Sequence, residues 1–114
     1  MAGSVLSELS VRQLRACKGR LTGELADPAV TLRGVLLSKG RRCSSEGCRC
    51  RRGELHGPYS YLATYADGRS RTIYVPGAEQ AAVAEHVVLT QRNEALLGEI
   101  SLVNLELLRR RALG

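Results

Sequence analysis

The sequence contains no tryptophan and no phenylalanine, and its only aromatic residues are four tyrosines. Any hydrophobic core must therefore be built largely from aliphatic side chains. The tyrosines at positions 59, 61, 65 and 74 all lie in one short segment, which follows a cluster of cysteines. The aromatic side chains are thus concentrated in one part of the chain.

Long apolar runs are also missing, because none approaches the roughly 20 residues that a transmembrane helix needs. The first residues, MAGSVLSELSVRQL, lack the basic flank and the continuous apolar stretch of a secretory signal. We therefore expect a cytoplasmic protein with no membrane partner. In that compartment, closely spaced cysteines are metal ligands or redox groups more often than structural disulfides.

Several catalytic signatures are absent as well. The chain has no phosphate-binding glycine loop with its lysine, no nucleophile elbow and no pair of carboxylates in an acid–base setting. It also lacks the Pro-Cys-x-x-Cys spacing and the adjacent glutamate of deaminase zinc sites. We therefore expect no enzymatic activity.

Acidic residues are scarce in the middle of the chain. Residues 33–71 hold nine basic and three acidic side chains, a balance of +6 that equals the net charge of the whole protein. Residues 1–32 and 72–114 contribute +1 and −1. A local basic surface indicates a polyanionic partner, and nucleic acid is the commonest one. A solvated basic loop that binds nothing is the alternative.

Three of the four cysteines lie in the stretch CSSEGCRCRRGELHGPY. Together with a histidine they provide three thiolates and one imidazole, the ligand set of a closed tetrahedral zinc site. The predicted ligands are Cys43, Cys48, Cys50 and His56. Thiolates favour zinc over magnesium or calcium, although iron is compatible with the same set. A redox couple of the last two cysteines, or unligated thiols beside a hydrogen-bonding histidine, are the alternatives.

A zinc ion at this position would hold a cationic loop at the base of a hairpin. Charged side chains that are fixed in advance lose less entropy when they meet phosphates. The predicted nucleic-acid contacts are Lys39, Arg41, Arg42, Arg49, Arg51, Arg52, Tyr65, Arg69 and Arg71. We expect double-stranded DNA in preference to RNA, contacted mainly along its backbone, with a salt slope of about −4.

The spacing of apolar residues predicts an α+β fold in a single domain, residues 1–114. An N-terminal helix is predicted over residues 1–27, with a break near Ser10, which forms a capping box with Gln13. Cys17 lies on the apolar stripe of this helix, where a buried thiol is favoured over a ligand. Residues 33–76 hold the zinc knuckle and a small antiparallel sheet, made of one strand and a hairpin. Residues 77–112 form a long helix that pairs with the first.

The dipeptide Asp67-Gly68 predicts the hairpin turn. With this turn, Tyr65 lies opposite Ser70 and Tyr61 opposite Tyr74, and all four tyrosines share one face of the sheet. The other face carries Leu62 and Ile73, and one of the two faces should pack on helices. We expect Tyr59 and Tyr61 to be buried and Tyr65 to be exposed, while the face that the helices cover stays open at this point.

The runs RRCSSEGCRCRRGELHGPYSYL, RTIYVP and SLVNLELLRR resemble a widespread set of short bacterial and archaeal proteins of uncharacterised function. Those proteins carry Cys-Gly-x-x-x-Cys-x-Cys and His-Gly-Pro-Tyr motifs, and the resemblance extends over residues 33–110. Ser44 and Ser60 stand where the family usually has glycine and often tyrosine, respectively. All four predicted zinc ligands match family positions, so the resemblance implies a metal site and supplies no activity.

Two further functions are compatible with the sequence. In the first, residues 83–108 form a helical interface with a second copy or a partner helix, and Asn104 fixes the register. In the second, the cysteines form a thiol-based redox or metal sensor.

Overall fold

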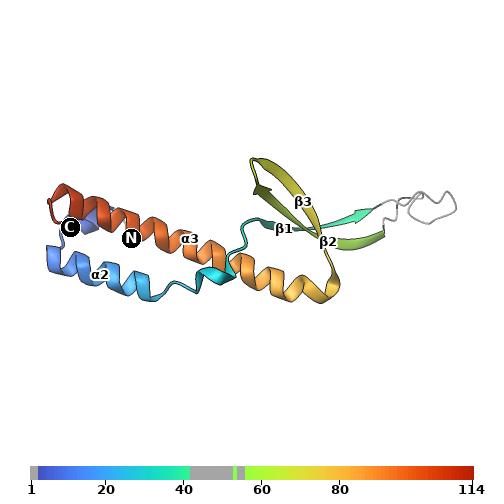
Figure 1. Ribbon diagram of the computed structural model, residues 1–114, viewed down its shortest axis with the longest axis horizontal. Coiled ribbons are helices and arrows are strands. Elements are labelled where there is room, and N and C mark those ends of the chain that lie inside the picture. The colour runs from blue at the N-terminus through green and yellow to red at the C-terminus, as the bar shows by residue number, and fades with distance from the viewer. Residues whose placement is uncertain (1–2, 42–52, 54–55) are drawn as a thin grey trace. The chain divides into compact units, whose positions relative to one another are not determined.

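The computed structural model describes residues 3–41, 53 and 56–114, and it confirms the predicted α+β class (Figure 1). A helical N-terminal region precedes a three-stranded antiparallel sheet, and a long helix follows it. The elements are α1 (Gly3–Leu6), α2 (Val11–Gly23), η1 (Pro28–Val30), β1 (Val35–Arg41), β2 (His56–Ala66), β3 (Arg69–Val75), η3 (Gly77–Glu79) and α3 (Gln80–Arg109).

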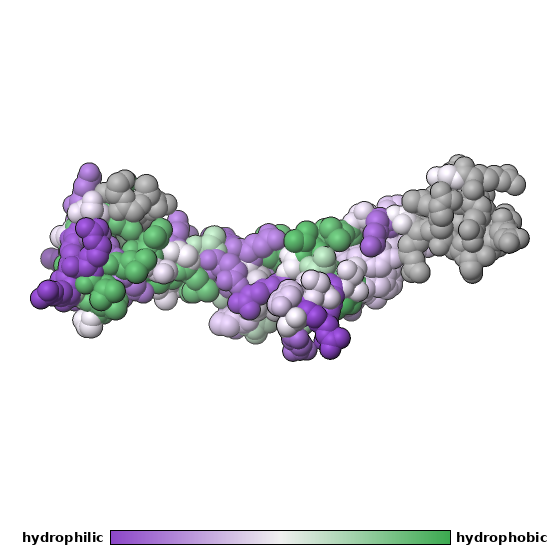
Figure 2. Space-filling view, turned by 90° about the horizontal axis from the view of Figure 1, so that it is seen from above, coloured by the Kyte–Doolittle hydropathy of each residue, from purple (hydrophilic) through white to green (hydrophobic). Residues whose placement is uncertain are grey.

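The chain divides into two compact units. The helical unit consists of Met1–Val30 together with Leu89–Gly114, and the sheet unit consists of Thr31–Val88. Helix α3 contributes residues 80–88 to the sheet unit and residues 89–109 to the helical unit. Over the described part of the chain, no helix combines the length and the apolar character needed to cross a bilayer. Figure 2 shows hydrophobic surface interrupted by hydrophilic side chains.

The predicted break near Ser10 is confirmed, because α1 ends at Leu6 and α2 begins at Val11. The Ser10 side-chain oxygen accepts a hydrogen bond from the Gln13 backbone N–H at 3.1 Å. In return, the Ser10 backbone N–H donates to the Gln13 side-chain oxygen at 2.9 Å. These two bonds give the backbone N–H groups of Ser10 and Gln13 hydrogen-bond partners, and they fix where α2 begins.

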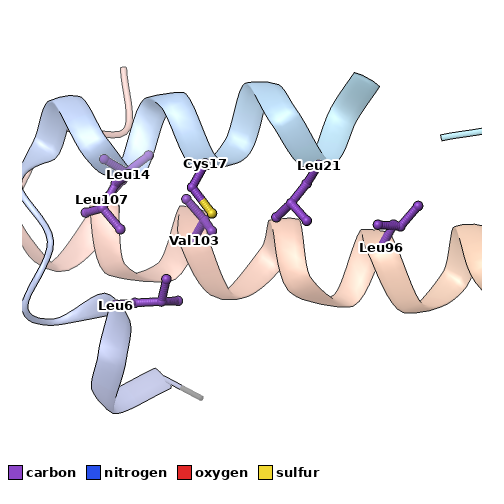
Figure 3. Close-up of a cluster of buried hydrophobic side chains, with 7 residues drawn as sticks. All are labelled: Leu6, Leu14, Cys17, Leu21, Leu96, Val103 and Leu107. Atoms are coloured by element: carbon purple, nitrogen blue, oxygen red, sulfur yellow. The ribbon is translucent and has the colours of Figure 1, made fainter. Parts of the chain in front are cut away.

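The core of the helical unit is aliphatic apart from one thiol, as the lack of large aromatic residues predicts. Leu14, Cys17 and Leu21 recur at three- and four-residue spacings on α2 and face α3 (Figure 3). The whole cluster comprises Leu6, Leu14, Cys17, Leu21, Leu96, Val103 and Leu107. The predicted pairing of the two helices and the predicted burial of Cys17 are therefore both confirmed.

The sheet has the order β1-β2-β3, and the predicted hairpin register is confirmed. Tyr65 pairs with Ser70, and Tyr61 pairs with Tyr74. The turn residues Asp67 and Gly68 both have positive φ angles, 52° and 77°. Two positive φ values are what a two-residue type I′ turn requires, and aspartate followed by glycine tolerates them well.

The face of the sheet that carries Leu62 is the one that packs on α3. Leu62 and Val75 form a buried cluster with Val87 of α3. Leu32, Leu36 and Val83 are partly buried against the same cluster. Because side chains alternate between the two faces of a strand, the four tyrosines point away from this helix. This settles the question that the sequence left open.

Candidate nucleic-acid interface

The structure describes only part of the predicted site. Lys39, Tyr65, Arg69 and Arg71 are described with their side chains, and Arg41 and His56 through their backbone alone. Outside the described residues lie Cys43, Cys48, Cys50, Arg42, Arg49, Arg51 and Arg52. The geometry of the site is therefore built from β1, the hairpin and the residues that precede β1.

The strands that flank the cysteine segment pair with each other at their ends. After a register shift that begins at Lys39, Arg41 pairs with His56. The two points at which the chain leaves β1 and enters β2 are therefore neighbours. No group of three His, Cys, Asp or Glu side chains is arranged for a metal among residues 3–41, 53 and 56–114, a set that omits three of the four predicted ligands. The zinc site stays a prediction.

A cluster of tyrosines occupies the face opposite α3. The ring of Tyr74 lies edge-on to those of Tyr61 and Tyr59, with centroid separations of 5.8 and 6.3 Å. The Lys39 ammonium lies 4.9 Å from the centroid of the Tyr61 ring. Edge-to-face rings and a cation over a ring are both attractive arrangements. These contacts position Lys39, one of the predicted contact residues, on the surface of the sheet.

This tyrosine face is open to solvent over much of its area. We define it as the side chains that alternate with the Leu62 side: Val35, Leu37, Lys39, Tyr59, Tyr61, Ala63, Tyr65, Ser70, Thr72 and Tyr74. Tyr65 is 70% exposed and Tyr74 is 51% exposed. Tyr61 is buried and Tyr59 is half-buried. The predictions for Tyr61 and Tyr65 are therefore confirmed, and Tyr59 is buried only in part.

The two hairpin arginines do not share this face. Arg69 pairs with Ala66 and Arg71 with Thr64, which places both arginines on the Leu62 side of the sheet, at the hairpin end. Arg71 lies 3.5 Å from the Asp67 carboxylate in an ion pair that is open to solvent. The structure thus brings Lys39 and Tyr65 to one face and divides them from Arg69 and Arg71.

A shallow groove beside the hairpin was not anticipated from the sequence. Its lining includes Arg33, Thr64, Tyr65, Ser70, Arg71 and Thr72, and we call it the hairpin groove. Arg33 is held there because its carbonyl oxygen accepts a hydrogen bond from the Thr64 hydroxyl at 2.7 Å. The next residue, Gly34, has φ = 147°, and a Cβ there would lie 2.7 Å from the Ala63 carbonyl oxygen. The one feature of the sequence that indicated a close backbone approach at this position was Gly34, directly before a predicted strand.

A second apolar surface lies on α3 within the helical unit. A surface groove there is lined by Leu97, Ile100, Ser101, Asn104, Leu105, Leu108 and Leu113. Leu97, Leu105 and Leu108 are exposed large apolar side chains. The Asn104 side-chain oxygen accepts a hydrogen bond from Lys18 at 3.0 Å, so this amide already has a partner within the chain. We call this surface the α3 stripe.

A model of a protein family, described as a domain of unknown function (DUF6788), matches residues 10–85, more than half of the chain. The chain belongs to this family. The DUF6788 match includes α2, all three strands and the first turns of α3, and therefore the tyrosine face and the hairpin groove. It stops before the α3 stripe. No curated protein and no solved structure is significantly similar to the chain.

Proposed function

We propose that this protein is a small zinc-stabilised module that binds nucleic acid, with double-stranded DNA as its preferred ligand. The observation that carries the proposal is the open tyrosine face, because most of it lies in residues 33–71, the segment that holds the entire net positive charge. A sheet surface that combines tyrosines with a lysine suits sugar and phosphate, to which most protein–DNA hydrogen bonds are made. Contacts of this kind position the protein without reading sequence.

The fixed position of the Lys39 side chain supports the proposal. Its ammonium is held over the Tyr61 ring, so less side-chain entropy is lost when it meets a phosphate than if it moved freely. The stabilisation by one exposed cation–π contact is about 0.5–1 kcal/mol, which is small enough to be exchanged for a stronger pairing with phosphate. Lys39 is thus oriented and still available.

The proposed zinc site fits the chain on both sides of the cysteine segment. Cys43 follows Arg41 by two residues, and Arg41 pairs with His56. Two residues of chain extend at most about 7 Å, so the first and last ligands of the set begin near the same strand pair. Three thiolates and one imidazole close the coordination of zinc and leave no position for substrate. The metal would therefore support the arginines next to the cysteines in sequence, Arg42, Arg49 and Arg51.

Binding to a labelled 20-base-pair duplex at several salt concentrations tests the proposal. We expect the logarithm of the affinity to fall with log salt at a slope of about −4, since four or five cations would contact phosphates. The double charge reversal Arg51→Glu/Arg52→Glu should abolish binding at moderate salt and keep the circular dichroism of the folded chain. Binding that is independent of salt would contradict the proposal.

A matched control uses two exposed arginines of the helical unit. Arg12→Glu/Arg111→Glu changes the net charge by the same amount, and both side chains lie outside the basic segment. We expect this variant to bind the duplex almost as well as the wild-type chain. An equal loss in both variants would mean that only total charge matters and that residues 33–71 form no specific surface.

The α3 stripe favours one second candidate, a helical interface with another copy of the chain. Its exposed leucines line a mostly apolar groove, and surfaces of this kind commonly mark sites of protein association. Its position outside the DUF6788 match makes it a separate feature from the tyrosine face.

A further inference from the structure

The tyrosine face exposes two aromatic rings on the side of the sheet that α3 does not cover. Tyr65 is 70% exposed and Tyr74 is 51% exposed, and neither belongs to a buried cluster. Rings that remain in water keep apolar surface that a flat ligand group can cover with a gain in free energy. The sheet therefore presents two places for a planar group on one face.

The surface between these two rings is low. Tyr74 pairs with Tyr61, which lies four residues before Tyr65 on β2, so the two rings are separated by about 13 Å along the strand. On β2 and β3, the side chains between them on this face are those of Ala63 and Thr72, which pair with each other. Both are small. A chain of nucleotides can therefore cross the sheet from one ring to the other without meeting a bulky side chain.

The charge of this face suits unpaired nucleotides. Lys39 is the one charged side chain among the ten that define the face, and these ten include no carboxylate. Its ammonium lies over the Tyr61 ring, and Tyr61 pairs with Tyr74. One lysine can neutralise one phosphate, whereas the exposed rings can contact the flat faces of bases. Proteins that bind single strands combine cationic side chains along the backbone with aromatic rings under the bases.

We propose that the tyrosine face binds a single-stranded DNA segment, with one base stacked on Tyr74, another on Tyr65 and a phosphate contacted by Lys39. The inference rests on the proposed function and adds that the preferred DNA carries unpaired nucleotides next to a duplex. A base inside a duplex is covered on both sides by its neighbours, whereas an unpaired base offers its flat face to an aromatic side chain.

The spacing of the rings sets the length of the segment. Successive bases of a duplex strand are about 3.4 Å apart, and the two rings are about 13 Å apart along the strand. The two stacked bases are therefore separated by other nucleotides, and one nucleotide cannot occupy both rings.

The test compares three labelled DNAs with the full-length protein: a blunt 20-base-pair duplex and the same duplex with a tail of one or five nucleotides. For the wild-type chain, we expect the five-nucleotide tail to raise the affinity about tenfold and the one-nucleotide tail about threefold, which is within the range of base stacking. Tyr65→Ala should lower the tenfold ratio to about threefold, because one of two rings is lost. Tyr65→Phe should preserve the ratio because the ring remains.

A matched control uses the opposite face of the same hairpin. Ile73 is 50% exposed and pairs with Leu62, so Ile73→Ala removes exposed apolar area on the side away from Tyr65. This variant should keep the tenfold ratio of five-nucleotide-tailed to blunt affinity.

Several results would overturn the inference while the proposed function survives. One is equal affinity of the wild-type chain for the blunt and the five-nucleotide-tailed DNA. Another is a ratio that falls as far in Tyr65→Phe or in Ile73→Ala as in Tyr65→Ala, since the aromatic ring on this face would then have no special part. Failure to bind any of the three DNAs at low salt would remove the proposed function itself.

Discussion

Gly34 occupies a position that admits no other residue without rearrangement. Its φ of 147° lies in the range that side chains disfavour, and a Cβ would approach the Ala63 carbonyl oxygen to 2.7 Å and a Leu62 methyl to 2.8 Å. Both neighbours belong to β2, which is distant in the sequence. A reader of the sequence sees a glycine before a strand, but the close approach exists only after β1 has paired with β2.

We expect Gly34→Ala to lower the free energy of unfolding by about 1–3 kcal/mol, because the backbone strain and the close contact add. Urea denaturation followed by circular dichroism measures this change. The matched control is Gly98→Ala on α3, where a Cβ meets nothing within 4 Å. That substitution should raise stability by about 0.5–1 kcal/mol through helix propensity. If both variants were equally stable, Gly34 would have no special place in the sheet.

Arg110 connects the end of α3 to the segment around α1. Its guanidinium donates hydrogen bonds to the backbone carbonyls of Leu6, Ser7 and Leu9, and its Nε donates to the Glu106 carboxylate at 2.9 Å. Glu106 is 7% exposed, so its charge depends on close partners. The Arg110 side chain thus provides hydrogen-bond donors for carbonyl groups at the end of α1 and in the turn that follows it.

Replacing Arg110 with methionine should destabilise the helical unit by about 3 kcal/mol, because a buried carboxylate and several carbonyls lose a charged donor. Arg109 bonds the same carboxylate at 3.1 Å, but its side chain is 74% exposed. Arg109→Met should therefore cost less than about 1 kcal/mol. Thermal unfolding of both variants gives the comparison, and similar midpoints would contradict the role of Arg110.

Elements with a local signal were predictable from the sequence. The start of α2 follows from Ser10 and Gln13, and the hairpin register follows from Asp67-Gly68, because each depends on residues that are neighbours in the chain. The face of the sheet that meets α3 was not predictable, since Leu62 and Tyr61 stand on opposite faces and both types of side chain can be buried. Only the packing of Val87 against Leu62 decides it.

The hairpin groove was missed for a similar reason. It combines Arg33, which lies before β1, with residues from both strands of the hairpin. Tyr65, Arg69 and Arg71 are all predicted contacts near the hairpin turn, but strand alternation puts the two arginines on the face opposite Tyr65. The described contact residues therefore lie on two faces of the sheet, with Lys39 and Tyr65 on one and the two arginines on the other. This division depends on strand pairing and is visible only in the structure.

The α3 stripe leads to a prediction about assembly. If the second candidate function holds, the wild-type chain sediments as a dimer, and Leu105→Glu/Leu108→Glu returns it to a monomer because two charges then lie in the apolar groove. Analytical ultracentrifugation at two protein concentrations measures this. Leu102→Glu is a suitable control, since Leu102 is also exposed on α3 and does not line the groove. A wild-type chain that is monomeric at all concentrations would exclude the candidate.

In the complete protein, we expect the arrangement of the basic side chains to depend on whether zinc is bound. The net charge of +6 resides in residues 33–71, and the four predicted zinc ligands lie in the same segment. Nine cationic side chains in one segment repel each other, and a metal that ties the chain together offsets that repulsion. Loss of zinc should therefore affect DNA binding more than it affects the helical unit.

We expect the purified protein to contain about one zinc ion per chain and to lose it, together with most of its DNA affinity, in Cys48→Ser. Elemental analysis and the duplex binding assay give the two readouts. Cys17→Ala is the matched control, because Cys17 is buried among leucines of the helical core and is not a predicted ligand. A zinc content that is unchanged in Cys48→Ser, or zero in the wild-type chain, would contradict the metal site.

The division of the chain into two units has a consequence for its synthesis. The helical unit joins Met1–Val30 to Leu89–Gly114, whereas the sheet unit is one continuous segment, Thr31–Val88. Helix α2 emerges from the ribosome early, but Leu96, Val103 and Leu107, which cover its apolar stripe, emerge last. We expect nascent chains whose first 90 residues have left the ribosome to expose α2 to proteases and chaperones, although the sheet can already form. Protection of α2 in such chains would show that it finds another partner during translation.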